Sequence, residues 1–551
     1  MSLLYKQYCE ETFDENGTLV GFDIRVPERF NFGYDVVDAL AKKDPERRAM
    51  LWTNDKGEEH TFTFGEMSEL SNRAANVFLS LGIKKGDAVM LVLKRHYQFW
   101  YAIVALHKIG AMVIPATNLL TKKDFVYRFK AASVSAIVCT PDGDVAEHAM
   151  EAAKECGGLR AMFMARGARG EWLDFDKLVA GASPVLNLPE EELPQNGDKM
   201  LMYFTSGTTG MPKMVWHDFT YPLGHMITAR HWHNVVPDGL HFTVADTGWG
   251  KAVWGKLYGQ WLCEAGVFTY DFDKFSGHDV LDMIQRHHIT TFCAPPTIYR
   301  FFIKEDLSKF DLSSLTYTTI AGEALNPEVY KQWYQLTGLK LMEGFGQTET
   351  TLTVCTLKGM EPKPGSMGKP SPAYRVHLID HDGKEAKSGE SGEIVIDFSN
   401  GRPCGMSGGY YRDEERTKNV WCENGLYHTG DLAWRDEDGY LWYVGRTDDV
   451  IKSSGYRIGP FEIESVLMEH PAVLECAVTG TPDPVRGQVV KATIVLARGY
   501  TPSEELKREL QTHVKNLTAP YKYPRVVEFM DELPKTISGK IRRVELRGEK
   551  K

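Results

Sequence analysis

One segment of the chain combines hydroxyl side chains, glycines and a lysine in a way that suits phosphate oxygens. It spans residues 203–213 and reads YFTSGTTGMPK. Backbone N–H groups, hydroxyls and one cation that follow directly from an expected strand can surround a phosphate group. The segment is not a Walker A loop, because Pro212 rather than glycine precedes Lys213 and the glycine spacing differs. Composition alone is equally typical of a flexible surface loop, so both interpretations stand on these residues.

The bulk composition indicates an ordinary globular protein of more than one domain. The chain has 551 residues, of which 43% are apolar and 25% charged, and single hydrophobic cores stop growing at about 250–300 residues. The net charge of −10 argues against nucleic acid or an anionic membrane as the main partner, since both need a basic surface. The most apolar stretch, residues 99–120, is interrupted by His107, Lys108 and Gly110, so no membrane span is expected.

The cysteines and the N-terminus lead to an expected location. Nine cysteines are scattered along the chain, without a CxxC pair, which is typical of reduced thiols rather than of a disulfide framework. The first residues, MSLLYKQYCEETFDENG, include several acids and follow neither a secretory nor an Arg-rich targeting pattern. We therefore expect a cytoplasmic protein.

Helical and strand patterns alternate between Thr63 and Thr140. Thr63 and Glu66 have the spacing of a capping box, and apolar residues follow at helical intervals until Gly82. Continuous apolar runs at 87–93, 111–116 and 135–140 predict buried strands, with helices at 97–107 and 122–132 between them. Strands joined by helices through short connections predict a parallel, doubly wound sheet.

The rest of the chain predicts a second sheet, an antiparallel piece and a small domain. Apolar runs near 201, 289, 317 and 341 end in glycine, serine, threonine or proline, and ligands of open α/β sheets bind at such strand ends. The expected fold is α/β, with a large N-terminal domain at 1–446 that holds two doubly wound α/β sublobes. Short strands between glycine and aspartate turns predict a β-barrel-like piece at about 368–443. Residues 447–551 are expected to form a small α+β C-terminal domain.

Six segments together resemble the adenylate-forming superfamily, which contains acyl-CoA synthetases, luciferases and peptide-synthetase adenylation domains. TSGTTGMPK is similar to the phosphate loop of this superfamily. The other segments follow in the family's order: AGEALNPEV at 321, EGFGQTET at 343, YHTGDLAWRDEDGY at 427, GRTDDVIKSSGYRIGPFEIES at 445 and LPKTISGKIRR at 533. SGYRIGPFEIES, PDPVRGQVVKA and APYKYPR look most like medium-chain acyl-CoA synthetases. The resemblance implies that a carboxylate and ATP form an acyl-adenylate and pyrophosphate, and that the acyl group then passes to coenzyme A.

The chemistry of the first step explains why such residue types are needed. A carboxylic acid with a pKa near ~4 is already ionised at neutral pH and needs no general base. The obstacle is the approach of an anion to a triphosphate, so cations and oriented donors should provide most of the catalysis. The resemblance implies that Lys540, Thr348 and Glu349 are catalytic, and that Glu349 holds Mg²⁺.

The resemblance also assigns the nucleotide site. Phe345 would stack on adenine, and Asp431 would accept the ribose hydroxyls beside Arg446. All residues expected to bind ATP are Thr205, Ser206, Gly207, Thr208, Thr209, Gly210, Lys213, Gly322, Glu323, Ala324, Glu343, Gly344, Phe345, Gly346, Gln347, Asp431 and Arg446. Taken singly, any of them has an ordinary structural explanation, such as a turn cap or a solvated surface charge.

For the thiol step the resemblance implies a mobile small domain that rotates about a hinge at Asp448. The rotation would withdraw Lys540 and present a loop to coenzyme A, whose thiol is partly ionised near neutral pH and already nucleophilic. The residues expected to bind coenzyme A are Ser454, Gly455, Tyr456, Arg457 and Arg486. A plain turn at Asp448 is the structural alternative.

The identity of the acid is the least determined part of the sequence. The resemblance places the acyl pocket near Trp249, Gly250 and Gly346, although an aromatic run is often simply core. Acetyl-CoA synthetases have a tryptophan at the place that matches Gly346, so glycine should leave room for an acid larger than acetate, medium-chain or branched. The alternatives are an aryl- or amino-acid adenylating enzyme that loads a carrier protein, a luciferase-like oxidation and a noncatalytic nucleotide sensor. A homo-oligomer is possible.

Two other patterns invite a different interpretation. Residues 405–409 match GxSxG, but Tyr410 and a charged run follow instead of a helix, so a nucleophile elbow is not expected. Several histidines cluster at 225–241, yet no cysteine or carboxylate completes a metal ligand set at a recognisable spacing. Core or solvated histidines are expected there.

Overall fold

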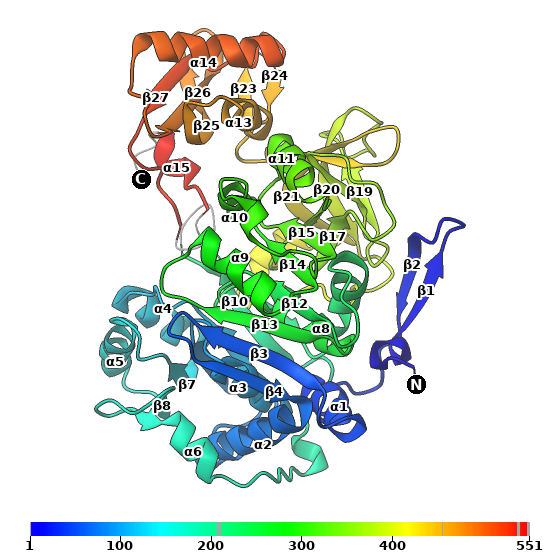
Figure 1. Ribbon diagram of the computed structural model, residues 1–551, viewed down its shortest axis with the longest axis vertical. Coiled ribbons are helices and arrows are strands. Elements are labelled where there is room, and N and C mark those ends of the chain that lie inside the picture. Colours follow the sequence, from blue (N-terminus) through cyan, green and yellow to red (C-terminus); the bar gives the residue numbers. More distant parts are fainter. Residues whose placement is uncertain (1, 206–210, 455, 537–539, 548–551) are drawn as a thin grey trace.

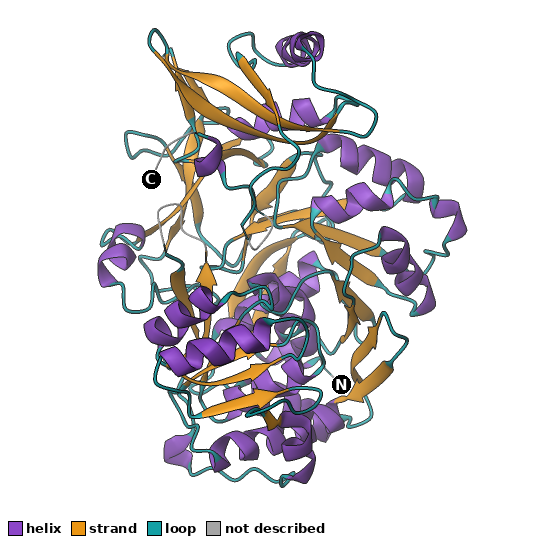
Figure 2. Ribbon diagram, turned by 90° about the vertical axis from the view of Figure 1, so that its left-hand side faces the viewer, coloured by secondary structure: helices purple, strands orange, loops and turns teal. Residues whose placement is uncertain are grey.

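The computed structural model describes residues 2–205, 211–454, 456–536 and 540–547. Figure 1 shows three bodies along the long axis: a lower one with the early segments, a middle one, and a small upper one with the C-terminal segments. Strands form the interior of these bodies and helices lie over them (Figure 2). No described helix is both long enough and apolar enough to cross a lipid bilayer.

The first sheet is parallel apart from one edge, as the alternating pattern predicts. β5 pairs in parallel with β6 and β7, while β11 runs antiparallel to β10 at the edge. Across the described part of this sheet the order is β11 (Lys213–Asp218), β10 (Lys199–Thr205), β6 (Met112–Pro115), β5 (Ala88–Val92), β7 (Val134–Cys139), β8 (Ala161–Met164) and β9 (Leu173–Asp174).

The helix predicted after Thr63 forms as the sequence indicates. The Thr63 hydroxyl accepts a hydrogen bond from the Glu66 backbone, and the Glu66 carboxylate accepts one from the Thr63 N–H. This capping box opens α2 (Phe64–Ser80), and Gly82 follows its end at φ +75°. Glycine enters this left-handed region without the steric cost that a Cβ atom imposes. The helix predicted at 97–107 is observed one residue later, as α3 (Gln98–Lys108), and the helix predicted at 122–132 is α4 (Lys122–Ala132), with the expected bounds.

The second sheet combines parallel and antiparallel strands. Its parallel part ends at β16, and β17 continues it in the antiparallel direction through β18 to the strands of the expected barrel-like piece. Across the described part of this sheet the order is β19 (Val376–Ile379), β20 (Ser391–Asp397), β21 (Leu426–Arg435), β22 (Leu441–Arg446), β18 (Ser366–Pro370), β17 (Leu352–Cys355), β16 (Leu341–Gly346), β15 (Tyr317–Ala321), β14 (Thr291–Ala294), β12 (Leu240–Thr243), β13 (Gly266–Asp271), β3 (Arg48–Asn54) and β4 (Glu59–Thr63).

The small upper body has a sheet and a hydrophobic core of its own. Buried residues such as Ile463, Leu510 and Ile494 join its helices to its sheet. The described strand order is β24 (Tyr456–Ile458), β23 (Ile451–Ser453), β26 (Gly487–Leu496) and β25 (Val473–Asp483), with β27 (Val526–Phe529) also beside β26. The body touches the rest of the protein through Asn326, whose amide donates to the Ser465 carbonyl at 3.1 Å.

Helices cover the sheets, and one hairpin near the N-terminus forms a small sheet of its own that packs against His231. The hairpin is β1 (Cys9–Phe13) with β2 (Leu19–Ile24), at the right of Figure 1. The remaining described α-helices are α1 (Ala39–Lys43), α3 (Gln98–Lys108), α5 (Val145–Glu155), α6 (Phe175–Gly181), α7 (Gly250–Lys256), α8 (Tyr258–Leu262), α9 (Gly277–Arg286), α10 (Pro296–Phe302), α11 (Pro327–Thr337), α12 (Glu414–Val420), α13 (Pro460–Met468), α14 (Glu504–Leu517) and α15 (Arg543–Leu546).

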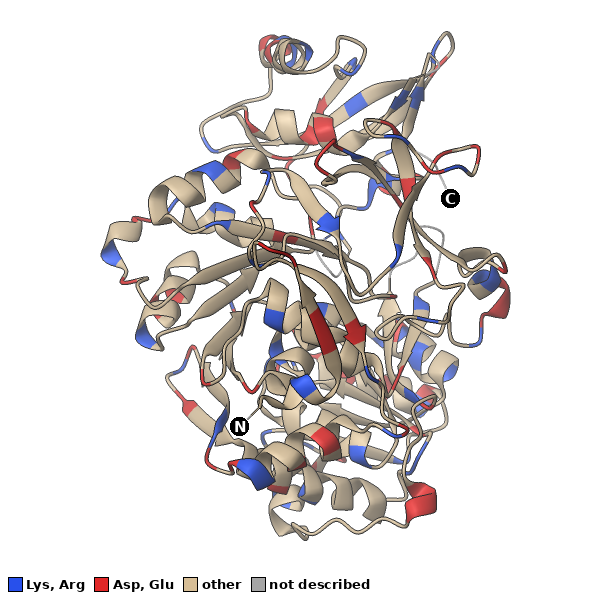
Figure 3. Ribbon diagram, turned by 90° about the vertical axis from the view of Figure 1, so that its right-hand side faces the viewer, with Lys and Arg blue, Asp and Glu red and all other residues tan. Residues whose placement is uncertain are grey.

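Charged side chains join the carboxyl ends of the two large sheets. His96, which follows β5, lies between Asp271 and Asp142, with nitrogen–oxygen distances of 3.0 and 3.1 Å. Burial lowers the pKa of His96, but the hydrogen bonds to these two carboxylates outweigh burial, so the pKa is raised. Elsewhere, acidic and basic residues are interspersed over the face shown in Figure 3.

The loop after β12 also packs tightly on the first sheet, which leads to a prediction. A Cβ atom on Gly248 would lie 2.3 Å from the Thr117 nitrogen and 2.4 Å from the Ala116 carbonyl carbon. Because backbone cannot move aside as a flexible side chain can, we expect Gly248→Ala to destabilise the protein by about 1–3 kcal/mol. Thermal unfolding of both proteins measures this. Gly181→Ala is the control, since no atom of the described residues lies within 4 Å of the place that its Cβ would take. An equal loss in both variants would contradict the packing argument.

Candidate functional site

Thr348 and Glu349 lie in a turn at the carboxyl end of β16 that is held from two sides. His217 on β11 donates from Nε2 to the Thr348 carbonyl at 2.8 Å. The Ser407 N–H donates to the Glu349 carbonyl at 2.7 Å. Burial lowers the pKa of His217 to about 4, so the ring is neutral at physiological pH and keeps this donor role. This turn is therefore held by β11, which contains His217, and by residues 405–409, which contain Ser407.

The Glu349 carboxylate belongs to a three-membered polar cluster. Tyr410 donates its hydroxyl hydrogen to Glu349 Oε1 at 3.1 Å, and Lys213 Nζ donates to the Tyr410 oxygen at 3.0 Å. Lys213 Nζ and Glu349 Oε1 lie 3.9 Å apart. Burial lowers the pKa of Lys213, and the charge of Glu349 opposes that effect. The cluster brings one cation and one carboxylate to the ends of β11 and β16.

Asp431 lies at the centre of a second network. Its carboxylate accepts hydrogen bonds from Gln347 Nε2, from the Tyr443 hydroxyl at 3.0 Å and from Arg446 Nη1 at 3.2 Å. Burial raises the pKa of Asp431, and the charges of Arg446 and Lys540 act in the opposite direction. The network joins β16, β21 and β22, and Tyr427 completes it by donating to Gln347 Oε1 at 2.6 Å.

Glu343 anchors the loop that the sequence places beside the adenine. Its Oε1 accepts a hydrogen bond from the Leu325 N–H at 3.2 Å, directly after Gly322, Glu323 and Ala324. The side chain is buried, and burial raises its pKa to about 8. Its Oε2 has no hydrogen-bond partner among the described residues. A largely protonated carboxyl group at neutral pH explains how this side chain is tolerated in the interior.

The expected acyl pocket is more crowded than the sequence suggests. A Cβ atom on Gly346 would lie 2.4 Å from the Trp254 ring carbon Cη2 and 2.4 Å from the Thr351 carbonyl oxygen. The Trp254 indole therefore takes the space beside Gly346 where a side chain would lie, and the expectation that this glycine leaves room for a larger acid stays a prediction. Trp249 caps α7, which carries Trp254, and Gly250 faces Tyr203 at 3.9 Å from its own would-be Cβ. Gly344 lies in β16, as Gly346 does, and is beside the Trp232 ring.

Lys540 and the residues expected to bind coenzyme A lie on different parts of the small body. Lys540 is exposed and close enough to Asp431 for its charge to act on the pKa of that carboxyl. β24 forms one edge of the small sheet, and α15, which follows Lys540, packs against β25 at the other edge. The structure therefore does not bring the two sets together.

The residues expected to bind coenzyme A that the structure describes lie at or near β24. Tyr456 is 51% exposed, and its ring stacks on Tyr521 with 4.2 Å between centroids. Arg486 Nη1 donates to the Ser454 hydroxyl at 3.3 Å, and Arg457 is exposed on β24. Ser206, Gly207, Thr208, Thr209, Gly210 and Gly455 lie outside the described residues.

Asp448 lies between β22 and β23, where the chain enters the small body. Its carboxylate lies 3.7 Å from Arg446 Nε, and its carbonyl accepts from Arg547 Nη2 at 2.9 Å. Phe345 is half-buried with its ring centroid 6.4 Å from that of Tyr443. Both residues therefore border the Asp431 network.

Several residues of the site carry no recognisable signal in the sequence. Tyr410 and Tyr443 hold Glu349 and Asp431, but isolated tyrosines give no pattern that marks them. Tyr427, which holds Gln347, instead opens the segment YHTGDLAWRDEDGY. The GxSxG segment at 405–409 is visible in the sequence, but its role is to hold Glu349 and not to supply a nucleophile. Ser407 in it donates to the Trp216 carbonyl at 2.8 Å and holds Glu349 through its backbone. As expected, the segment is no nucleophile elbow, and His225, His233 and His241 are buried in the core.

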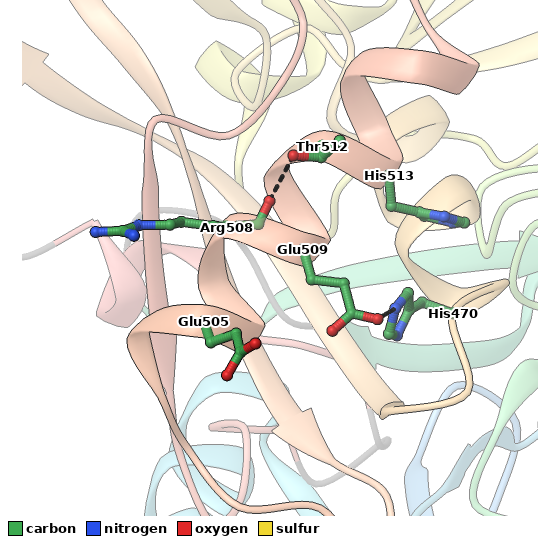
Figure 4. A pocket seen from close by; sticks show the side chains of 6 residues that line it. All are labelled: His470, Glu505, Arg508, Glu509, Thr512 and His513. Atoms are coloured by element: carbon green, nitrogen blue, oxygen red, sulfur yellow. Dashed lines mark hydrogen bonds and ion pairs between the residues drawn. The ribbon is translucent and has the colours of Figure 1, made fainter.

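A groove on α14 lies apart from these residues (Figure 4). His470 Nδ1 accepts from the Ala472 N–H at 3.2 Å, so its Nε2 carries the proton and donates to Glu509 at 3.1 Å. His513 Nε2 donates to the Val466 carbonyl at 3.0 Å. Because these nitrogens are engaged in this way, the histidines serve the packing of α14 rather than a metal.

Lys213 and Glu349 thus belong to one polar cluster, and Asp431 on β21 lies in a second one that the charge of Lys540 reaches. Comparison with known proteins shows the family. Residues 37–411 match the family described as AMP-binding enzyme, and residues 462–540 match its C-terminal domain. The chain belongs to the AMP-binding enzyme family. The predicted resemblance to adenylate-forming enzymes is thereby confirmed.

Relatives of this AMP-binding enzyme match over nearly their whole length. "Acyl-coenzyme A synthetase ACSM3, mitochondrial" of Mus musculus is 40% identical, covering 99% of this chain and 96% of the relative. "Acyl-coenzyme A synthetase ACSM4, mitochondrial" of Rattus norvegicus is 43% identical, covering 95% and 91%. The prediction of a cytoplasmic location is contradicted, because both relatives are named as mitochondrial. Free cysteines indicate a reducing environment but do not distinguish one reducing compartment from another.

Solved structures confirm the fold class. The anthranilate CoA ligase AuaEII, in complex with anthranoyl-AMP, has a TM-score of 0.85 and 28% identity, covering 95% of this chain and 97% of its own. A benzoate CoA ligase from Burkholderia xenovorans LB400 has a TM-score of 0.81 and 25% identity, covering 94% and 100%. The expected α/β architecture, a large N-terminal part with a small C-terminal domain, is confirmed.

The raised pKa of Glu343 predicts a pH-dependent contribution to stability. A carboxyl group whose pKa is raised to about 8 from about 4.3 in the unfolded chain stabilises the fold at low pH. That stabilisation is lost as the pH rises through this window, because ionisation of the buried group becomes the cost of staying folded. Glutamine keeps the acceptor for Leu325 and cannot ionise.

We therefore expect the melting temperature of Glu343→Gln to rise relative to the wild type between pH 5 and pH 8. A relative gain of about 2–4 °C corresponds to ~1 kcal/mol in a domain of 150–250 residues. Thermal melts at several pH values provide the measurement, with Glu323→Gln, a side chain at the surface, as the control. A pH-independent difference would contradict a buried carboxyl that titrates in this range.

Proposed function

We propose that this AMP-binding enzyme is an AMP-forming acyl-CoA synthetase. In the first step a carboxylate oxygen of the acid attacks the α-phosphorus of ATP, and the bond to pyrophosphate breaks. In the second step the sulfur of coenzyme A attacks the acyl carbon, and AMP leaves. The observation that carries the proposal is the convergence of Lys213, Glu349, Asp431 and Lys540 from two sheets and the small body. The names of the synthetase relatives support it.

The residues around Glu349 fit Mg²⁺ together with a triphosphate. Glu349 Oε1 is bound by Tyr410, whereas Oε2 has no hydrogen bond within the described residues and is available to a metal. The Thr205 hydroxyl, within the segment 203–213 that suits phosphate oxygens, is buried and also has no hydrogen-bond partner among the described residues. One carboxylate plus phosphate oxygens and waters is how Mg²⁺ is commonly held. When bound, Mg²⁺ would neutralise part of the charge of the triphosphate.

The chain's own residues then position the nucleotide. Asp431, held as described, would accept hydrogen bonds from the ribose hydroxyls, with Arg446 beside it. Phe345 and the backbone at 322–324 would border adenine, while Thr348 would donate to the α-phosphate. Lys540 would bring a positive charge to the α-phosphate and to the acid carboxylate as they approach. Each group acts by orientation or charge, because the carboxylate needs no base.

The thiol step requires that Lys540 withdraws, and we propose rotation of the small body about Asp448. Gly455 would then border the pantetheine chain, while Ser454 and Tyr456 would lie beside it. Arg457 and Arg486 would pair with the phosphates of coenzyme A. The position of Asp448 between the two bodies supports a hinge, and hinges are commonly a few residues in such connections.

We propose an acid larger than acetate, medium-chain or branched, that enters along Trp249 and Gly250. The Trp254 ring, which lies against Gly346, would form the inner end of this pocket and limit the length of the acid. Loading of a carrier protein with an aryl or amino acid is the second candidate function. The similar structures of an anthranilate and a benzoate CoA ligase favour keeping aryl acids among the candidate substrates.

The direct test is acid-dependent chemistry across a panel of acids. With ATP and Mg²⁺, we expect acid-dependent exchange of pyrophosphate into ATP and consumption of coenzyme A. Butyrate, methylbutyrate, hexanoate or benzoate should be preferred to acetate, because the rings of Trp249 and Trp254 would line the proposed pocket with apolar surface. Exchange without thioester formation on free coenzyme A would point to the carrier-loading enzyme, and the absence of exchange with every acid would refute the proposal.

The two half-reactions should separate genetically. Lys540→Ala is expected to reduce pyrophosphate exchange by about 10²–10³-fold, the loss typical of one removed transition-state donor. It should leave thioester formation from a supplied acyl-adenylate within a few-fold. Asp448→Pro should do the opposite, because it stiffens the connection between the bodies. Single-turnover assays of each step provide the measurement, and a thioester step that runs normally in Asp448→Pro would argue against the hinge.

A further inference from the structure

Tyr410 lies between the two charged groups that the proposed function assigns to the MgATP end of the site. Its hydroxyl accepts from Lys213 Nζ at 3.0 Å and donates to Glu349 Oε1 at 3.1 Å. We propose that Tyr410 is a positioning residue, which holds Lys213 toward the phosphates and Glu349 Oε2 toward the metal. This inference deepens the proposed function and rests on it.

The ring of Tyr410 is held so that its hydroxyl stays in place. The residue is 6% exposed. Its N–H donates to the Thr417 hydroxyl at 2.9 Å, and its backbone forms a bridge with Val215 on β11. Its ring packs edge-on against Trp421, with 5.2 Å between the centroids. A rigid tyrosine can therefore act as a spacer between two flexible charged side chains.

The chemistry of a phenol explains why a spacer is needed. A hydroxyl has one hydrogen to donate and lone pairs that accept, so Tyr410 satisfies both charged groups at once. Lys213 and Glu349 are 3.9 Å apart, and without the hydroxyl their opposite charges would favour a direct pair. Such a pair would take Lys213 from the phosphates and Glu349 from the metal. Among the described residues, Tyr410 takes one hydrogen of the Lys213 ammonium and Glu349 Oε1, which leaves the other ammonium hydrogens and Oε2 to face MgATP.

Removal of the hydroxyl alone tests this role. Tyr410→Phe keeps the ring and its packing against Trp421. Calorimetric titration of the full-length protein with MgATP should show a dissociation constant raised by about 10–100-fold, the typical cost of losing an outer partner of a metal-binding group. AMP, titrated without metal, should bind within twofold of the wild type, because the Asp431 network is untouched. The Mg²⁺ concentration for half-maximal turnover at saturating ATP should rise in parallel.

Tyr411→Phe is the matched control. Tyr411 is the next residue, and its ring faces Arg412 with 4.9 Å between the guanidinium carbon and the ring centroid. We expect its MgATP affinity to stay within twofold of the wild type.

The titrations give a clear decision on Tyr410. A loss of MgATP affinity of fivefold or more, with AMP affinity kept, supports the positioning role. A smaller loss overturns the role, and so does an equal loss for MgATP and AMP, which would indicate a general deformation. Because the titrations need neither acid nor coenzyme A, they stay informative if the wild type binds MgATP but activates no acid. That result would reject the proposed reaction and not the role of Tyr410.

Discussion

The carboxylate of Asp431 is buried, so neighbouring side chains must stabilise its charge in place of water. The arrangement of the strands around it follows from this requirement. A buried charge without partners costs several kcal/mol, so the surroundings must supply donors. Gln347, which directly follows β16, provides one donor, and Tyr443 and Arg446 on β22 provide the others, around Asp431 on β21. Burial still raises the pKa of Asp431. The three strands must therefore meet at one place, which joins the parallel and antiparallel parts of the second sheet.

The same need for partners explains the rigid base of the site. The turn that carries Glu349 has His217 on one side and Ser407 on the other, and each fixes a backbone carbonyl. Burial keeps His217 neutral over the physiological range, and the single ring hydrogen lies on Nε2, which faces the Thr348 carbonyl. The segment from Ser407 to Tyr410 thus holds both the backbone and the side chain of Glu349. The carboxylate keeps one direction, so that a ligand does not have to order it first.

The sequence predicted what depends on local patterns and missed what depends on distant contacts. The capping box at Thr63 and the bounds of α4 follow from residues a few positions apart. By contrast, β3 pairs with β13, which lies more than two hundred residues later, and no local period indicates that pairing. In the site, the motifs located Glu349 and Asp431, whereas Tyr410 was missed because a lone tyrosine has no distinctive spacing. The contact between the Trp254 ring and Gly346 could not be predicted either, because the two residues are about ninety positions apart and no local pattern links them.

The layout of the small body carries the last step. Lys540 precedes α15, which packs on β25, whereas Tyr456 begins β24 at the opposite edge of the same sheet. Because one sheet carries both edges, we expect the small body to turn as a unit and to present one edge at a time to the middle body. Under the proposed function, the β25 edge with Lys540 faces the nucleotide while the adenylate forms, and the β24 edge with Tyr456 faces it while the thiol attacks. Because β24 and β25 are opposite edges of one sheet, the proposed function predicts rotation of the whole body rather than rearrangement of a loop.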